Sequence, residues 1–374
     1  MMKPLGRYFF EPPDPRKLPA PEGEQFRRRR RVQSLLSQCQ GLDRDRYTEV
    51  LQEILVHGVA ALPDLRAATR ASEGEAASMA RAMVRLLVPD EVGAALAKGL
   101  ARAEQAYPVE LGASLLARLD DPDLDPDRSL GELDRLAAKA GRFISETLRE
   151  PLTNAVLGTR TLDVLFRLGE FWKAEGFRGN MEEYYDPKNT WLQHVLERRV
   201  GLPITLSIVY LALCRRLGIK ADGVGLPGHF VTRVEVCTPD AKGYLFIDPF
   251  HSARPLDVDD CRQLAESHGN RFEPEDHLRP VYARDILIRM CHNLLAIYDH
   301  LDKHAESERV ATVLTYMNPA DPMPRMIRAE RRLRRGEHRK ASEDLQQVLL
   351  LSPHGSMAQV AMKMLRQISY DHPF

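Results

Sequence analysis

The feature that most constrains the fold is a helical pattern followed directly by two strand patterns. The helical pattern covers residues 202–218, where Pro203 suits the first turn of a helix and Gly218 suits its end. The strand patterns follow at residues 229–236 and 244–250, on either side of a turn-rich segment. The first strand has one apolar face, because Phe, Thr, Val and Val alternate with His, Val, Arg and Glu. A helix followed by a β-hairpin predicts an α+β core.

Helical patterns flank this core on both sides. From about residue 32 to 175 apolar side chains recur with helical spacing, interrupted by an acidic, Pro-containing stretch at 120–129. That stretch lacks the spacing of a calcium-binding loop, so we interpret it as a linker that caps a helix. From about residue 283 the pattern is helical again. We therefore predict a predominantly helical α+β protein.

The predicted organisation has four parts, and the last part contains a repeat. The parts are a Pro/Arg-rich arm at 1–44, a helical N-terminal region at 45–175, the α+β core at 176–280, and helical repeats at 281–374. In the last part, two segments end at Pro319 and Pro353, which are 34 positions apart (353 − 319). Gly336 and Ala341 lie at offsets that suit close helix packing. This period is typical of tetratricopeptide helix pairs.

The charge balance argues against a nucleic-acid-binding protein. Lys plus Arg and Asp plus Glu are equal at 53 each, so the formal net charge is +0 and no overall basic field attracts nucleic acid. The run Arg27–Arg31 fits either an anionic partner or the solvated start of a helix. We expect a protein or peptide partner instead, and the sequence leaves the oligomeric state open.

The cysteine pattern and the hydropathy predict a cytoplasmic protein. The five cysteines are scattered without a CxxC pair, which favours reduced thiols and argues against a zinc site. We predict no cofactor. No stretch approaches the roughly 18 apolar residues of a membrane span, and the N-terminal sequence lacks the pattern of a signal peptide.

The two strands bring together a histidine and an acid. A catalytic histidine needs an acid that orients one ring nitrogen and a nucleophile near the other. His229 begins the first strand and Asp248 ends the second, so a hairpin places them side by side. We predict a hydrogen bond between them. The nucleophile would best lie at the start of the preceding helix, where the helix dipole lowers the pKa of a thiol.

Residues 178–255 resemble the transglutaminase-like superfamily, and specifically its SirB1 branch. The residues that carry the resemblance are "YYDPKNTWLQHVLERRVGLPITLSIVYLALCRRLG", "GVGLPGHFVTR" and "FIDPF". With the flanking helical regions, the resemblance covers roughly residues 45–374. It implies a papain-like core of one helix and an antiparallel sheet, with His229 and Asp248 in the positions of the family's His and Asp. Active members begin the helix with a cysteine, and counting back along the helix puts Pro203 in that position.

The missing cysteine leaves two classes of function open. One is a non-catalytic binding or adaptor module, in which Asn189, Pro203 and Thr205 line a pocket beside the His229–Asp248 pair. The other is a hydrolase, a peptidase or an acyl-transferring enzyme, in which the pair activates a hydroxyl group or water. Thr205 and Ser207 have the nearest hydroxyls, but we expect Thr205 to cap or bond at the helix start. Similarly, Asn189 or Thr190 is expected to cap the helix near residues 190–200.

Overall fold

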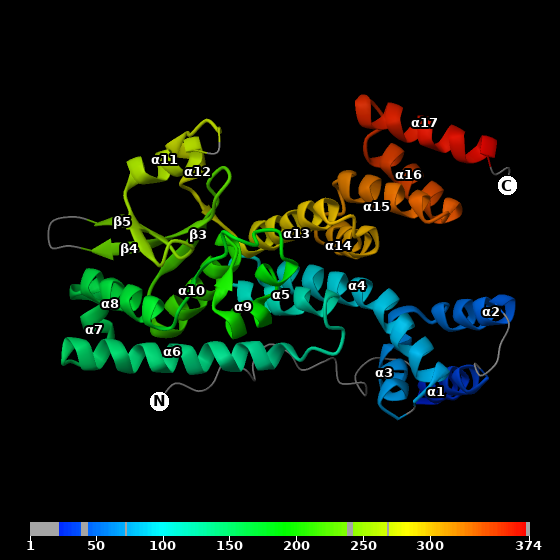
Figure 1. Cartoon of the computed structure of the whole chain (residues 1–374), viewed down its shortest axis with the longest axis horizontal. Helices are drawn as coiled ribbons and strands as arrows, with labels where there is room; N and C mark the ends of the chain where they lie inside the picture. The colour runs from blue at the N-terminus through cyan, green and yellow to red at the C-terminus, as the bar shows by residue number, and fades with distance from the viewer. Residues whose placement is uncertain (1–21, 39–43, 72, 238–241, 268, 372–374) are drawn as a thin grey trace. The chain divides into compact units, whose positions relative to one another are not determined.

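The described residues fold into two compact units. The computed structural model describes residues 22–38, 44–71, 73–237, 242–267 and 269–371. Cys39 and the Pro-rich part of the predicted arm lie outside them. One unit contains residues 98–117 and 125–303. The other contains the described residues before 98, residues 118–124 and the described residues from 304 onward. The elements confirm the predicted α+β, predominantly helical fold (Figure 1).

The unit of residues 98–117 and 125–303 carries all the strands of the described chain. Its helices are α5 (Val109–Leu116), α6 (Pro126–Leu148), α7 (Asn154–Thr159), α8 (Thr161–Ala174), η4 (Pro187–Asn189), α9 (Leu192–Arg198), α10 (Pro203–Leu217), α11 (Val258–Ser267), α12 (Pro274–His277) and α13 (Ala283–His300). Its strands are β1 (Arg178–Gly179), β2 (Val200–Gly201), β3 (Ala221–Val224), β4 (Val231–Cys237), β5 (Lys242–Asp248), β6 (Arg254–Leu256) and β7 (Pro280–Val281). We call it the core unit.

The main sheet of the core unit is antiparallel and has the order β6-β5-β4-β3-β7. β4 and β5 form the predicted hairpin, with Thr232 opposite Ile247 and Val234 opposite Leu245. The short strands β1 and β2 pair separately and in parallel. This register puts the turn before β4, which contains His229, close to the end of β5, where Asp248 lies.

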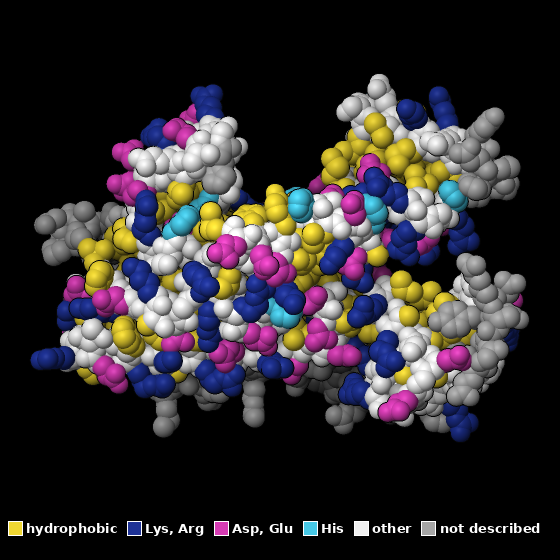
Figure 2. Space-filling view, in the orientation of Figure 1, with side chains coloured by type: hydrophobic (Ala, Val, Ile, Leu, Met, Phe, Trp, Pro, Cys, Tyr) yellow, Lys and Arg dark blue, Asp and Glu magenta, His cyan; other side chains and the backbone are white. Residues whose placement is uncertain are grey.

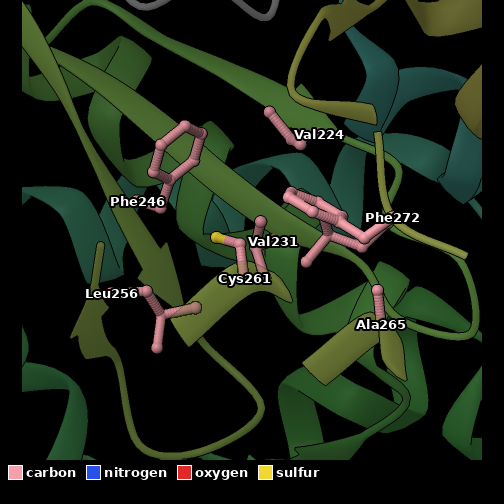
Figure 3. Packing of buried hydrophobic residues seen from close by; sticks show 8 residues of the cluster. Val224, Val231, Phe246, Leu256, Cys261, Ala265 and Phe272 are labelled. Carbon is pink, nitrogen blue, oxygen red and sulfur yellow. The ribbon is translucent and has the colours of Figure 1, made fainter. Parts of the chain in front are cut away.

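Both faces of the sheet are covered, which the one-sided strand pattern did not predict. α10 packs against β3 and β4, while α11 and α12 lie over the other face (Figure 1). On the α11 side, Val231 of β4 and Phe246 of β5 contact a buried cluster that includes Cys261, Ala265 and Phe272 (Figure 3). Val231 was expected on the polar face of its strand. It is buried because α11 supplies a second apolar layer.

The helix α10 begins and ends where the sequence predicted. Pro203 occupies its first turn, where the missing N–H has no intrahelical partner, and Gly218 ends it with a positive φ of 79°. α10 also packs against α6 and α5. The acidic linker caps α6 as expected, because Asp125 accepts a hydrogen bond from the backbone N–H of Asp127.

The second unit is entirely helical within the described residues. Its helices are α1 (Glu22–Ser37), α2 (Arg44–Leu55), η2 (Gly58–Ala61), α3 (Leu62–Ala71), α4 (Glu75–Ala103, whose end from residue 98 belongs to the core unit), η3 (Ala117–Leu119, shared in the same way), α14 (His304–Met317), α15 (Met323–Arg334), α16 (His338–Leu351) and α17 (Ser356–Asp371). α14 packs against α15, α15 against α16, and α16 against α17. None of the described helices is both long and apolar enough to span a bilayer.

The arginine run lies in the middle of α1, five residues after its start, rather than at the start of a helix. Arg28 pairs with Asp64 of α3 at 3.5 Å, and Arg31 pairs with Glu53 of α2. These acids neutralise part of the local positive charge. On the face drawn in Figure 2, basic and acidic side chains are interspersed rather than separated, which agrees with the balanced composition.

Candidate functional site

His229 is fixed by its backbone in the turn before β4. Its N–H donates to the carbonyl oxygen of Leu226 at 3.2 Å, and the preceding Gly228 has a φ of 75°, which favours glycine. Arg289 of α13 donates to the carbonyl oxygens of both Leu226 and His229, each at 2.8 Å. The guanidinium of Arg289 also lies 5.5 Å from the ring centre of Phe230. Arg289 therefore holds the turn that presents the histidine, a role that the sequence did not reveal.

Asp248 is buried at the end of β5 and is bonded through both carboxylate oxygens. Its Oδ2 lies 2.9 Å from Nε2 of His229, which confirms the predicted hydrogen bond. Its Oδ1 accepts backbone N–H groups of Phe250 at 3.0 Å and His251 at 3.4 Å. The two backbone contacts orient the carboxylate, so that Oδ2 faces the imidazole.

A second histidine, His251, completes the cluster. Its Nδ1 lies 2.7 Å from the same Oδ2 of Asp248, and its ring centre lies 5.7 Å from that of His229. The His251 side chain is 47% exposed, whereas the Asp248 side chain is 1% exposed. Our sequence interpretation missed His251. The available signal was its position three residues after the acid, within the turn that follows the strand.

The cluster keeps its carboxylate ionised. Burial is the largest influence on the Asp248 pKa and raises it, but the hydrogen bonds from His229 and His251 together outweigh burial and hold the pKa well below its usual range. The hydrogen bond to Asp248 raises the pKa of His251, against a smaller opposing effect of burial. The site therefore contains a fixed negative charge between two imidazoles.

The start of α10 lies beside the histidine but carries no nucleophile. Ser207, one turn into the helix, donates to the carbonyl oxygen of Phe230 at 3.3 Å, which places this end of α10 against the residue after His229. Pro203 is buried at the first helical position. Thr205 is fully buried, and its hydroxyl donates to the carbonyl oxygen of Thr190 at 3.4 Å. The Thr205 hydroxyl is thus engaged, but by Thr190 before α9 and not within the start of α10 as expected.

Asn189 does not cap the helix that follows it, contrary to the prediction. Trp191 is the N-cap of α9 and supplies no side-chain cap. The side chain of Asn189 instead donates to the carbonyl oxygens of Glu183 at 2.7 Å and Tyr184 at 3.3 Å. Asn180 donates to the Asn189 side-chain oxygen at 3.1 Å. The fully buried Asn189 therefore holds the 180–184 loop, and its side-chain oxygen, which an N-cap would use, accepts from Asn180 instead.

No cysteine whose side chain the structure describes could replace the missing nucleophile. Cys214, Cys261 and Cys291 are buried free thiols. Burial raises the pKa of all three, to about 12 for Cys261 and for Cys291. Thiols with raised pKa values are unreactive near neutral pH.

Comparison with known proteins agrees with this geometry. The fold and the His–Asp arrangement define a transglutaminase-like protein, and the family model described as "Transglutaminase-like superfamily" matches residues 127–292. A UPF0162 protein of Xylella fastidiosa (strain Temecula1) is 33% identical over 259 residues, covering 67% of this chain and 86% of that protein. The chain belongs to the UPF0162 family.

More distant relatives share shorter stretches. A UPF0162 protein of Pseudomonas aeruginosa is 31% identical over 179 residues, or 47% of this chain and 60% of that protein. The human F-box only protein 21 is 34% identical over 125 residues, which cover 32% of this chain and 19% of that protein. No solved structure matches the chain.

Proposed function

We propose that this protein is a non-catalytic, SirB1-type member of the transglutaminase-like superfamily that binds a peptide or protein partner through its core. The observation that carries this proposal is the buried Pro203 at the start of α10, the helix whose Ser207 bonds to the residue after His229, together with an intact His229–Asp248 pair. Proline offers no nucleophile, so the superfamily's covalent step has no residue to start it. The pair then serves to join the turn before β4 to the end of β5.

A loop near the pair supports binding to a partner. Met181, Tyr184 and Tyr185 are 73%, 38% and 47% exposed, and Asn189 holds the loop that carries them. Arg289, which fixes the histidine turn, lies close enough to Tyr184 to lower that phenol's pKa, although burial has the larger and opposite effect. Tyrosine and methionine are enriched in interfaces between proteins. This loop is the part of the core unit that we propose contacts the partner.

The helical end of the chain supports a second binding groove of the tetratricopeptide type. α14 begins at His304 and α16 begins at His338, which are 34 positions apart (338 − 304). Ala341 is fully buried in a cluster with Ala329 and Leu345, as close helix packing requires. Such helix pairs form concave surfaces that bind peptides. The buried free thiols support a reducing compartment, the cytoplasm.

The rival function, a hydrolase, is favoured by one observation, the 2.9 Å contact between His229 and Asp248. An assay of ester and amide hydrolysis by the full chain separates the two functions. We expect the same background rate for the natural chain and for His229→Ala. A rate that falls when His229 is replaced would establish the hydrolase.

The binding proposal is tested with peptides selected from a displayed library on the full chain. We expect the double variant Met181→Ser, Tyr185→Ala to lose at least about tenfold in affinity for the selected peptides, since aromatic anchors dominate interfaces. The matched control is Tyr244→Ala, because Tyr244 is also an exposed tyrosine of the core unit. Equal affinity in the double variant and the control would refute a role for the loop. Selected peptides that bind both variants as tightly as they bind the natural chain would place the partner-binding surface elsewhere.

A further inference from the structure

Three metal-ligating atoms meet at the end of β5. Nε2 of His229, Oδ2 of Asp248 and Nδ1 of His251 all lie within 4.8 Å of one another, and this is the one such group of three among the described residues. We propose that these side chains bind one divalent transition-metal ion of the kind that Zn²⁺ represents. The proposal does not depend on the proposed function, because neither the missing nucleophile nor the partner-binding loop enters it.

The spacing of the ligand atoms is close to what such an ion needs. A tetrahedral zinc ion about 2.1 Å from nitrogen and oxygen ligands holds them about 3.4 Å apart. Here the two ring nitrogens lie 2.9 Å and 2.7 Å from Oδ2. Both contacts must lengthen slightly to admit the ion, and His251, the half-exposed one of the three side chains, has the most freedom to move.

The residues around the three ligands hold them in place. Oδ1 of Asp248 accepts two backbone N–H groups, which leaves Oδ2 directed at the rings. Arg289 fixes the backbone of His229 through two hydrogen bonds of 2.8 Å. Contacts of this kind around metal ligands set their orientation and strengthen binding. The cluster is therefore preorganised rather than a chance group of surface side chains.

The ligand types select the class of ion. Two imidazoles and one carboxylate suit zinc, iron, nickel or copper, whereas calcium and magnesium prefer oxygen ligands. Three protein ligands leave a coordination position for water or for a side chain of a bound partner. The half-exposed His251 side chain provides the route by which an ion enters. The sequence interpretation predicted no metal because it considered patterned cysteines and overlooked His251.

The first test is calorimetric titration of the full chain, stripped of metal with a chelator, with ZnCl₂. We expect one ion to bind per chain and His251→Ala to weaken binding by at least about tenfold, because replacing even an outer partner of a metal ligand typically costs that much. The control is His292→Ala, which removes an exposed histidine from α13 of the same unit and should leave the affinity unchanged. Equal affinity in the natural chain and His251→Ala, or no stoichiometric binding, would overturn the proposal.

A second readout keeps the test independent of affinity alone. Co²⁺ replaces Zn²⁺ in such sites and gives visible absorption bands that report its ligands. We expect these bands in the natural chain and in His292→Ala, but not in His251→Ala. Because His251 is half-exposed, its replacement should preserve the fold, which circular dichroism checks. Bands that persist in His251→Ala would place the ion at other residues and refute the site.

Discussion

Nε2 of His229 lies 2.9 Å from Oδ2 of Asp248, and both side chains are almost fully buried. The two residues are 19 positions apart in sequence and lie at the same end of the β4–β5 hairpin, His229 before β4 and Asp248 at the end of β5. Because Nε2 is occupied by the carboxylate, the orientation of the imidazole is set by the hairpin itself. The pair is thus a structural connection whether or not any reaction occurs at the site.

Replacing the buried acid should destabilise the protein. Asp248→Asn removes a buried charge that two imidazoles and two backbone N–H groups contact, so we expect a loss of about 2 kcal/mol in the free energy of unfolding. His251→Ala removes a half-exposed partner of the same acid and should cost about 1 kcal/mol or less. Denaturant unfolding of both variants measures the difference. A larger loss for His251→Ala than for Asp248→Asn would contradict the assigned hydrogen bonding.

The two shifted pKa values predict opposite pH dependences in metal-free protein. The folded-state pKa of Asp248 is lowered, so its stabilisation is present above the unfolded value of about 4 and is lost as the pH falls. The folded-state pKa of His251 is raised, so its stabilisation is complete below about pH 6.5 and is lost as the pH rises through the folded value.

Unfolding measured with a chelator between about pH 6 and about pH 9 tests the His251 prediction. We expect the natural chain to lose a small part of its stability over this range and His251→Ala to lose less. Identical slopes in the two proteins would mean that the folded and unfolded states bind the same number of protons at His251.

None of the described cysteines should react rapidly with iodoacetamide. The thiols of Cys214, Cys261 and Cys291 are buried and their pKa values are raised, so little thiolate forms at neutral pH. We expect these three positions to label more slowly than free cysteine, as read by mass spectrometry of digested peptides. Fast labelling at one of them that disappears in His229→Ala would revive a thiol enzyme.

A buried charge network should stabilise the helical end of the chain. Asp344 of α16 is 3% exposed and accepts hydrogen bonds from Arg328 at 2.5 and 2.9 Å and from Arg332 at 2.7 Å. Asp344→Ala leaves both guanidinium groups without this acid and should cost about 3 kcal/mol. The control is Glu343→Ala, because Glu343 forms an exposed ion pair with Arg339 worth about 0.5 kcal/mol or less. Equal losses in denaturant unfolding would show that the network contributes little.

Sequence reasoning located the scaffold of the site because local rules determine it. Proline at a helix start and glycine at a helix end have direct conformational causes, so the bounds of α10 followed from Pro203 and Gly218. The pairing of His229 with Asp248 followed from hairpin geometry, because an antiparallel hairpin places the start of its first strand beside the end of its second.

Contacts between distant segments could not be derived in the same way. Val231 is buried because α11 covers its face of the sheet, and no local pattern at β4 announces that helix. Arg289 reaches the histidine turn from about 60 positions away along the chain. Asn189 has a sequence context that suits a cap, yet Asn180 donates to the side-chain oxygen that a cap would use. Local propensity fails where tertiary partners compete for the same polar group.

We propose that Pro203 occupies the position of the superfamily's nucleophile and faces His229. Pro203→Cys places a thiol at the start of α10 at a cost of about 1 kcal/mol from the freer unfolded chain. A helix start alone lowers the pKa of a thiol. The matched control is therefore Val258→Cys, at the first residue of α11, where we predict no histidine partner for the thiol.

The deciding measurement is the pH titration of thiolate ultraviolet absorbance in Pro203→Cys, with and without His229→Ala. We predict a pKa below the usual value of about 8.5 in Pro203→Cys, lower than in Val258→Cys, and a rise when His229 is also replaced. A thiol that titrates like free cysteine in both backgrounds would mean that position 203 does not face the histidine, and the assignment of the missing nucleophile would be wrong.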